Sequence, residues 1–145
     1  MDALPASVTH ALPLRLIDGS GAALNLTAEL RYDASDPYAV DAVFHTGEPR
    51  GVRWVFAREL LSEGLFRPSG EGDVHVSPLV DENGRAIVLI ELRSPDGEAV
   101  LHAPADGLAQ FLQSTYAIVA PGGESDYIDL DLLVDELRRS GGPAL

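Results

Sequence analysis

Polar and apolar residues alternate along residues 23–32, where Leu24, Leu26, Ala28 and Leu30 would share one face of the chain. A period of two residues is typical of a β-strand that buries one face. Similar apolar segments recur along the sequence and are separated by turns rich in Gly, Pro, Asp and Ser. They predict seven strands, at residues 8–17, 23–32, 38–45, 52–57, 74–80, 85–92 and 98–103.

Three other segments carry apolar residues at the spacing of a helix. Residues 57–64 continue from the fourth strand, and Gly64 is predicted to end this short helix in a left-handed cap. Residues 104–116 predict a second helix that starts at Pro104, a residue favoured in the first helical turn. An acidic segment at residues 129–140 predicts a third helix, with an apolar stripe and arginines near its end.

Length and composition favour one globular domain over residues 1–145. Apolar residues make up 46% of the chain, which is enough for a core, and no shift in composition divides it. The elements predict an α+β fold in which an antiparallel, barrel-like sheet of about seven strands packs with about three helices. The sequence has no apolar run of membrane-spanning length and no secretory signal pattern, so we expect a cytoplasmic protein without a membrane span.

Charge and residue usage exclude several classes of function. The chain has 23 acidic and ten basic residues, a formal net charge of −13, and all ten basic residues are arginine. Because a strongly anionic chain repels phosphates, its charge opposes nucleic acid and anionic membrane surfaces as partners. Without lysine there is no Schiff-base chemistry, and without cysteine there are no disulfides, thiol nucleophiles or thiolate metal sites.

The sequence offers no convincing grouping of reactive side chains. The histidines lie in different predicted strands without the spacing of a metal-binding motif; they are His10, His45, His75 and His102. The Gly-rich turn at 70–73 lacks the Gly-Lys-Ser/Thr motif of a phosphate-binding loop, and the acidic C-terminal segment lacks the pattern of a calcium loop. We therefore predict no catalytic, metal or cofactor-binding residues and favour an interaction protein. An enzyme would require His45 or His75 to meet carboxylates in a pocket.

The stretch VRWVFARELLSEGL contains Trp54, the only tryptophan of the chain. Val52, Trp54 and Phe56 would lie on one face of a strand that runs directly into a helix. Trp54 has two interpretations. It is either a large core residue packed under this strand-to-helix corner or an aromatic anchor at an interface with a partner or a second subunit.

Several longer stretches together resemble one protein family. They are LRYDASDPYAVDAVFHTG, VRWVFARELLSEGL, RPSGEGDVHVSP, RSPDGEAVLHAPADGLAQFLQSTYAIV and YIDLDLLVDEL. These motifs are similar to those of the SsgA-like proteins of sporulating actinobacteria, and within them to the SsgB type. The resemblance runs from about residue 8 to residue 139, and motifs of this length are specific.

The resemblance implies a non-enzymatic regulator of cell division that localises to future septa. There it would recruit the division GTPase FtsZ and promote assembly of the FtsZ ring, with an SsgA-type protein as its localiser. It also implies a homotrimer with a barrel-like core, similar in shape to the Whirly single-stranded nucleic-acid binders. Nucleic-acid binding is thus the alternative function, which the net charge of −13 opposes.

The resemblance does not identify contact residues, so we predict them from the strand-to-helix corner. Arg53, Arg58 and Glu59 are expected on the exposed rim of the corner as contacts for FtsZ. The reason is that FtsZ-type partners are acidic and arginine is favoured at interfaces. Trp54 or Phe56, together with apolar edge strands, is expected at the contacts between subunits of the trimer.

Overall fold

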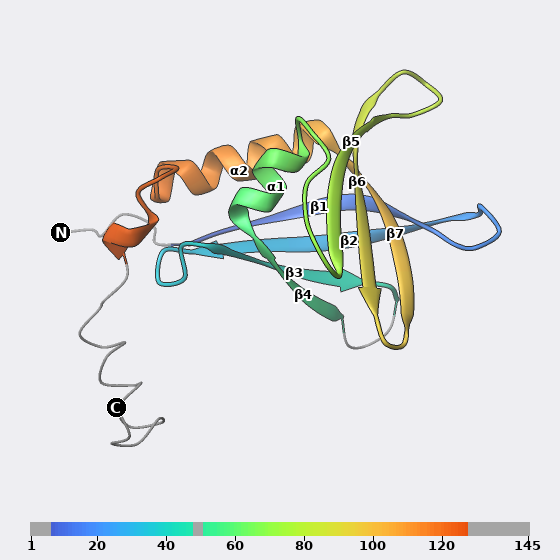
Figure 1. Cartoon of the computed structure of the whole chain (residues 1–145), viewed down its shortest axis with the longest axis horizontal. Helices are drawn as coiled ribbons and strands as arrows, with labels where there is room; N and C mark the ends of the chain where they lie inside the picture. Colours follow the sequence, from blue (N-terminus) through green and yellow to red (C-terminus); the bar gives the residue numbers. More distant parts are fainter. Residues whose placement is uncertain (1–6, 48–50, 128–145) are drawn as a thin grey trace.

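Seven antiparallel strands form one strongly curved sheet in the computed structural model, which describes residues 7–47 and 51–127 (Figure 1). The strands are β1 (Ser7–Ile17), β2 (Ala23–Asp33), β3 (Ala39–His45), β4 (Val52–Ala57), β5 (Val74–Val80), β6 (Ala86–Ser94) and β7 (Gly97–Pro104). Their order across the sheet is β4-β3-β2-β1-β7-β6-β5, and the sheet curls into half a barrel. The seven strands and the antiparallel, barrel-like sheet predicted from the sequence are therefore confirmed.

The described residues contain two α-helices, α1 (Arg58–Gly64) and α2 (Ala105–Ile118), and the short 3-10 helix η1 (Glu124–Tyr127). The two α-helices correspond to the first two of the three predicted helices. The third, predicted at residues 129–140, lies outside the described residues. α2 begins one residue later than predicted, because Pro104 keeps an extended backbone (φ −67°, ψ 128°) and occupies the cap position.

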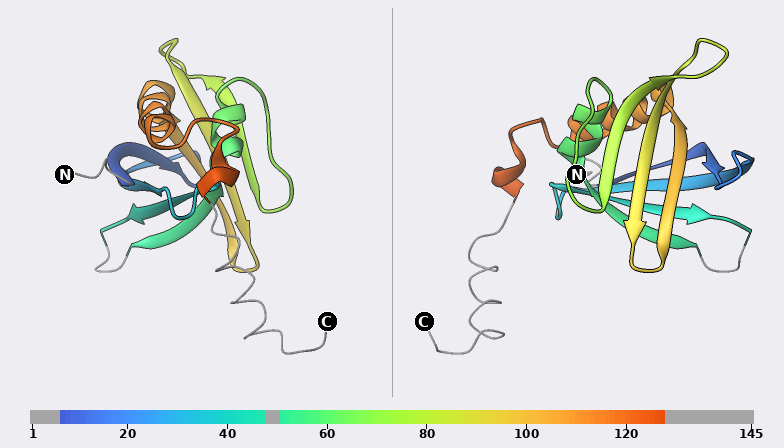
Figure 2. Two further views of the ribbon diagram at one scale, coloured as in Figure 1. Left: turned by 90° about the vertical axis from the view of Figure 1, so that its left-hand side faces the viewer. Right: turned by 45° about the vertical axis from the view of Figure 1, so that its right-hand side comes forward.

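The core lies between the inner face of the sheet and α2, which contacts β1, β6 and β7 (Figure 2). α2 buries residues that recur at helical spacing: Leu108, Phe111, Leu112 and Thr115. Strand β2 buries every second residue from Leu26 to Tyr32, as the alternation predicted. Leu24, predicted on the same face, is nevertheless 55% exposed, because it lies near the start of the strand, before the buried series begins. Helix α1 adds Leu61, which is 1% exposed, so the sheet and both α-helices enclose the core.

The prediction that Gly64 ends α1 in a left-handed cap is wrong. Leu65, the residue after the helix, has a right-handed helical backbone (φ −68°, ψ −23°), and Gly64 is itself the last helical residue. Packing requires glycine at this position instead, because a Cβ atom on Gly64 would overlap with the side chain of Val76 in β5. The missing side chain lets α1 lie directly against the sheet.

The strand-to-helix corner as a candidate interface

The five residues predicted as contacts all lie where β4 runs into α1. Ala57 keeps an extended backbone (φ −67°, ψ 133°), and the helix starts at the next residue. The backbone N–H of Arg58 donates to the carbonyl of Tyr38 over 2.8 Å, which fixes the corner against the segment that precedes β3. The five side chains nevertheless point in different directions, and this decides which of them a partner can reach.

Arg53 lies on the outer face of the sheet and is exposed. Its Nη2 and Nε donate to Oδ1 of Asp41 over 2.6 and 3.0 Å, and 67% of the Arg53 side chain is accessible to solvent. An exposed ion pair of this kind stabilises a fold by only about 0–1 kcal/mol. Arg53 can therefore exchange Asp41 for a partner at little cost, and its role as a contact stays a prediction.

Trp54 and Phe56 lie on the inner face of β4, as their spacing predicted. Phe56 is only 3% exposed and packs edge-to-face against Phe44, with ring centroids 6.5 Å apart. The expectation that Phe56 contacts another subunit is therefore wrong, because the core already covers its ring. Trp54 is half-buried on the edge strand: it packs against the core and keeps part of its surface exposed. Of the two, only Trp54 can contribute to an interface.

The expectation that Arg58 lies on the exposed rim is also wrong. Arg58 is 1% exposed, and its guanidinium group lies at the C-terminal end of α2. Nη1 donates to the carbonyl of Val119 over 2.7 Å, and at 3.4 Å it also reaches the carbonyl and Oγ1 of Thr115. The last carbonyls of a helix lack partners within the helix and carry partial negative charge, so a buried cation satisfies both needs.

Two tyrosines and a glutamate complete the environment of Arg58. The guanidinium carbon lies 4.8 Å from the ring centroid of Tyr32 and 5.0 Å from that of Tyr116. Nη2 donates to Oε2 of Glu124 over 2.7 Å, and this hydrogen bond is the main reason why the pKa of Glu124 is lowered. Arg58 thus joins the strand-to-helix corner to the end of α2 and to η1, and acts within the protein.

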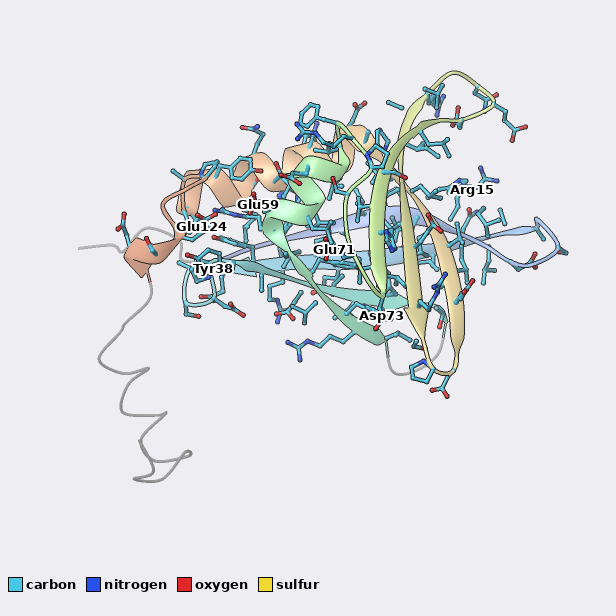
Figure 3. All side chains as sticks on the ribbon, viewed as in Figure 1. Arg15, Tyr38, Glu59, Glu71, Asp73 and Glu124 are labelled. Atoms are coloured by element: carbon cyan, nitrogen blue, oxygen red, sulfur yellow. The ribbon has the colours of Figure 1, made fainter. Side chains whose placement is uncertain are left out.

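Glu59 is exposed, as predicted, and borders a hollow of about 440 Å³, which we call the corner hollow. Tyr38, Glu63, Tyr116 and Glu124 also line it. Figure 3 shows Tyr38, Glu59 and Glu124 at the same end of the molecule. Arg58 also lines the hollow, but it is only 1% exposed and its guanidinium group is bound to Glu124. The exposed charged groups here are therefore the carboxylates of Glu59 and Glu63. The role of Glu59 as a contact stays a prediction.

His45 and His75, the histidines that an enzyme would need, form no recognisable reactive site. His45 is exposed, with Nε2 3.6 Å from Oε2 of Glu29. His75 does lie beside carboxylates, since Asp73 and Glu91 line the same hollow, but that hollow has a volume of only about 20 Å³. Small-molecule sites usually measure about 300–1,000 Å³. Within residues 7–47 and 51–127, no group of three or more His, Cys, Asp or Glu side chains is placed to hold a metal ion.

Comparison with known proteins identifies the family. A family model described as "Streptomyces sporulation and cell division protein, SsgA" matches residues 26–124. The chain belongs to the SsgA family. Among curated members, the sporulation-specific cell division protein SsgB of Streptomyces coelicolor is 53% identical over 125 residues, which cover 86% of this chain and 90% of that protein. The protein of the same name from Thermobifida fusca is 45% identical over 94% of this chain and 98% of the relative.

Solved structures of the SsgA family have the same fold. One of them superposes with a TM-score of 0.80 at 52% identity. Its description states that mutations in SsgB correlate to longitudinal cell division during sporulation of Streptomyces coelicolor. It covers 84% of this chain and 95% of the other. An SsgA-like sporulation-specific cell division protein from Thermobifida fusca superposes with a TM-score of 0.83 at 43% identity, covering 94% and 98%. None of the helices within the described ranges is long and apolar enough to cross a membrane.

Proposed function

We propose that this protein is a non-enzymatic regulator of sporulation-specific cell division, which localises in the cytoplasm to septum sites, recruits FtsZ there and promotes assembly of the FtsZ ring. One observation carries the proposal: the chain is 53% identical to the Streptomyces coelicolor protein named SsgB, over 86% of this chain and 90% of the relative. Identity at this level across nearly the whole of both chains supports a shared role in cell division.

We further propose a homotrimer that an SsgA-type protein brings to the septum. Strand β4 lies at one edge of the sheet and exposes Val52 and Val55, each with 50% of its surface accessible, beside the half-buried Trp54. This apolar edge supports subunit contacts along β4. Three subunits would present three copies of each contact, which can raise avidity for a polymer by a factor of about 10² to 10⁴.

The experiment is co-sedimentation with FtsZ polymers of Streptomyces coelicolor at low salt, with the SsgB protein of that organism as positive control. We expect this protein to pellet only with polymerised FtsZ, and we expect Arg53→Gln together with Glu59→Gln to reduce the pelleted fraction. Arg67→Gln is the matched control, because Arg67 is exposed on the loop between α1 and β5. Equal pelleting with and without FtsZ polymers, while SsgB pellets with them, would contradict the proposal.

A further inference from the structure

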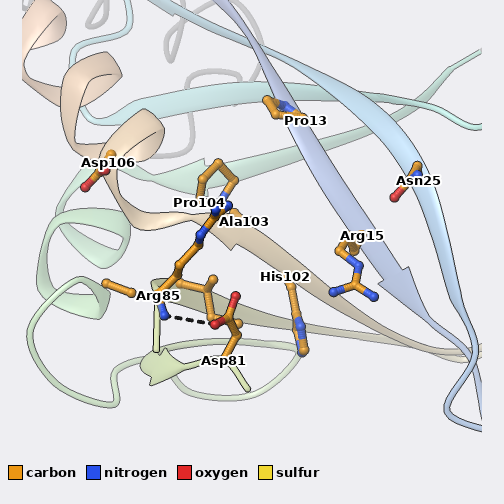
Figure 4. A pocket seen from close by; sticks show the side chains of 11 residues that line it. Pro13, Arg15, Asn25, Asp81, Arg85, His102, Ala103, Pro104 and Asp106 are labelled. Atoms are coloured by element: carbon orange, nitrogen blue, oxygen red, sulfur yellow. Dashed lines mark hydrogen bonds between the residues drawn. The ribbon is translucent and has the colours of Figure 1, made fainter. Parts of the chain in front are cut away.

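A second hollow opens on the outer face of the sheet between β1 and β7 (Figure 4). These strands pair over only three residues, where Arg15 faces His102 and Ile17 faces Val100. Two steps beyond Arg15, the same register would bring Pro13 opposite Pro104. The described pairing of β1 with β7 does not reach this point, and neither proline has a backbone N–H that could extend it. We call the opening beside these prolines the outer hollow.

The outer hollow has a volume of about 640 Å³, and two exposed arginines, Arg15 and Arg85, line it. Arg15 and His102 are cross-strand neighbours on its wall, and Arg85 reaches it from the loop between β5 and β6. Neither Arg15 nor Arg85 forms an ion pair with any residue of the described ranges. In contrast, four other described arginines do form such pairs: Arg31, Arg53, Arg58 and Arg93.

Two aspartates also line the outer hollow, and other interactions stabilise their charges. Oδ1 of Asp81 accepts hydrogen bonds from the backbone N–H groups of Asn83 and Arg85, both over 2.9 Å, which hold the β5–β6 loop in shape. Asp106 lies in the first turn of α2, where the helix dipole favours a negative charge. The two aspartates balance the two arginines in formal charge, but neither aspartate forms an ion pair with Arg15 or Arg85 in the described ranges, so both guanidinium groups can bind a ligand.

The remaining walls are apolar, since Pro13, Ile87 and Pro104 also line the outer hollow. Its volume lies within the usual range for ligand sites, about 300–1,000 Å³, and can accept several side chains. A ligand that pairs with both arginines and packs against these walls combines negative charge with apolar groups. A nucleic acid carries a phosphate at every nucleotide, and a protein of net charge −13 repels such a polyanion. A peptide can present one or two carboxylates beside apolar side chains.

We propose that the outer hollow binds an extended acidic segment of a partner protein. An Asp or Glu side chain of the segment would bind between Arg15 and Arg85, and a neighbouring apolar side chain would pack against Ile87 and Pro104. This site is distinct from the strand-to-helix corner and does not depend on FtsZ being the partner.

The test measures fluorescence anisotropy of a labelled twelve-residue peptide that carries four aspartates and two leucines among Gly and Ser. A second peptide has Asn at every Asp. At about 50 mM salt, where charge interactions are weakly screened, we expect saturable binding of the acidic peptide and at least tenfold weaker binding of the Asn peptide. Arg15→Gln combined with Arg85→Gln should weaken binding of the acidic peptide at least tenfold. Arg67→Gln, an exposed arginine outside the hollow, should change it less than twofold.

Several outcomes would overturn the proposal. They are no binding of the acidic peptide up to 1 mM, equal binding of both peptides, or equal losses in the Arg67 variant and the double variant. A labelled oligothymidylate that binds more tightly than the peptide and is lost in the double variant would show that the ligand class is wrong. Thermal unfolding of each variant checks that it folds. Because the assay contains no FtsZ, its result is independent of the proposed role in FtsZ recruitment.

Discussion

Arg58 should be far more important for stability than any exposed arginine of this protein. The Arg58→Ala change would leave the Glu124 carboxylate and the carbonyl of Val119, which accept its two shortest hydrogen bonds at 2.7 Å, without that donor. Removing one partner of a buried ion pair typically costs about 3–5 kcal/mol. Since single domains unfold with about 5–15 kcal/mol, this change would remove a large part of the total stability.

Arg53→Ala is the matched control, because it removes the same residue type from an ion pair only five positions away. The Arg53–Asp41 contact is 2.6 Å and the Arg58–Glu124 contact 2.7 Å, but the Arg53 side chain is 67% exposed and that of Arg58 only 2%. We expect Arg53→Ala to cost about 0–1 kcal/mol. The two ion pairs have similar distances but opposite burial, so the difference between the two losses of stability measures the effect of burial.

Urea denaturation at pH 7, followed by far-UV circular dichroism, measures both variants. With a slope of about 2 kcal/mol per M urea, Arg58→Ala should lower the midpoint by about 1.5–2.5 M and Arg53→Ala by less than about 0.5 M. Arg58→Lys should be intermediate, because one ammonium group keeps the charge but lacks the planar fork that reaches both Val119 and Glu124. Losses within about 0.5 kcal/mol of each other for the two alanine variants would refute the argument from burial.

Three further predictions follow from other parts of the structure. The pKa of Glu124 is lowered in the fold, so its carboxylate stabilises the protein above the ordinary glutamate pKa of about 4.3. In urea denaturation at pH 7, the unfolding free energies of wild type and Glu124→Gln should therefore differ by about 1–3 kcal/mol. The two values should converge as the pH falls through the lowered pKa. Gly64→Ala should lower the unfolding free energy by about 1–3 kcal/mol, because the new Cβ meets Val76. Gly19→Ala is the control: no described atom lies within 4 Å of its new Cβ, so it should change the unfolding free energy by less than about 0.5 kcal/mol. Similar losses for the two variants would argue against the packing role of Gly64. At about 50 mM salt the protein should not shift a labelled single-stranded oligonucleotide in a gel, and a shift that weakens steeply with salt would favour the Whirly-like alternative.

The sheet could be predicted because its information is local. Alternation in residues 23–32 already assigns an inner and an outer face to β2, and Leu26 and Leu30 are indeed buried. The order of strands requires more, because β1 and β7 are far apart in sequence and pair over only three residues. The role of Gly64 was missed for the same reason: its neighbour, Val76, belongs to a strand that the local pattern of α1 cannot indicate.

The candidate site was predicted less well, and Arg58 shows why. Its charge suggested exposure, but it continues the inward-facing series of Trp54 and Phe56, so the strand period did contain a signal of burial. The partners that make burial favourable could not be seen in the sequence, because Glu124 lies 66 residues away and the Val119 carbonyl 61 residues away. The outer hollow was missed as well, because it depends on the pairing of β1 with β7, which no local pattern in the sequence indicates.

The distribution of arginine decides which charges a partner protein can reach. Arg58 lines the corner hollow but is only 1% exposed, so the exposed charges there are those of Glu59 and Glu63, whereas the exposed Arg15 and Arg85 line the outer hollow. Arg15 and Glu59 lie toward opposite ends of the molecule (Figure 3). The argument that an acidic partner seeks arginine therefore applies to the outer hollow and to the exposed Arg53, but not to the corner hollow. A partner that occupied both hollows would need an acidic group at one and a basic group at the other. That requirement would fix its orientation, because the reversed orientation would bring like charges together at both sites.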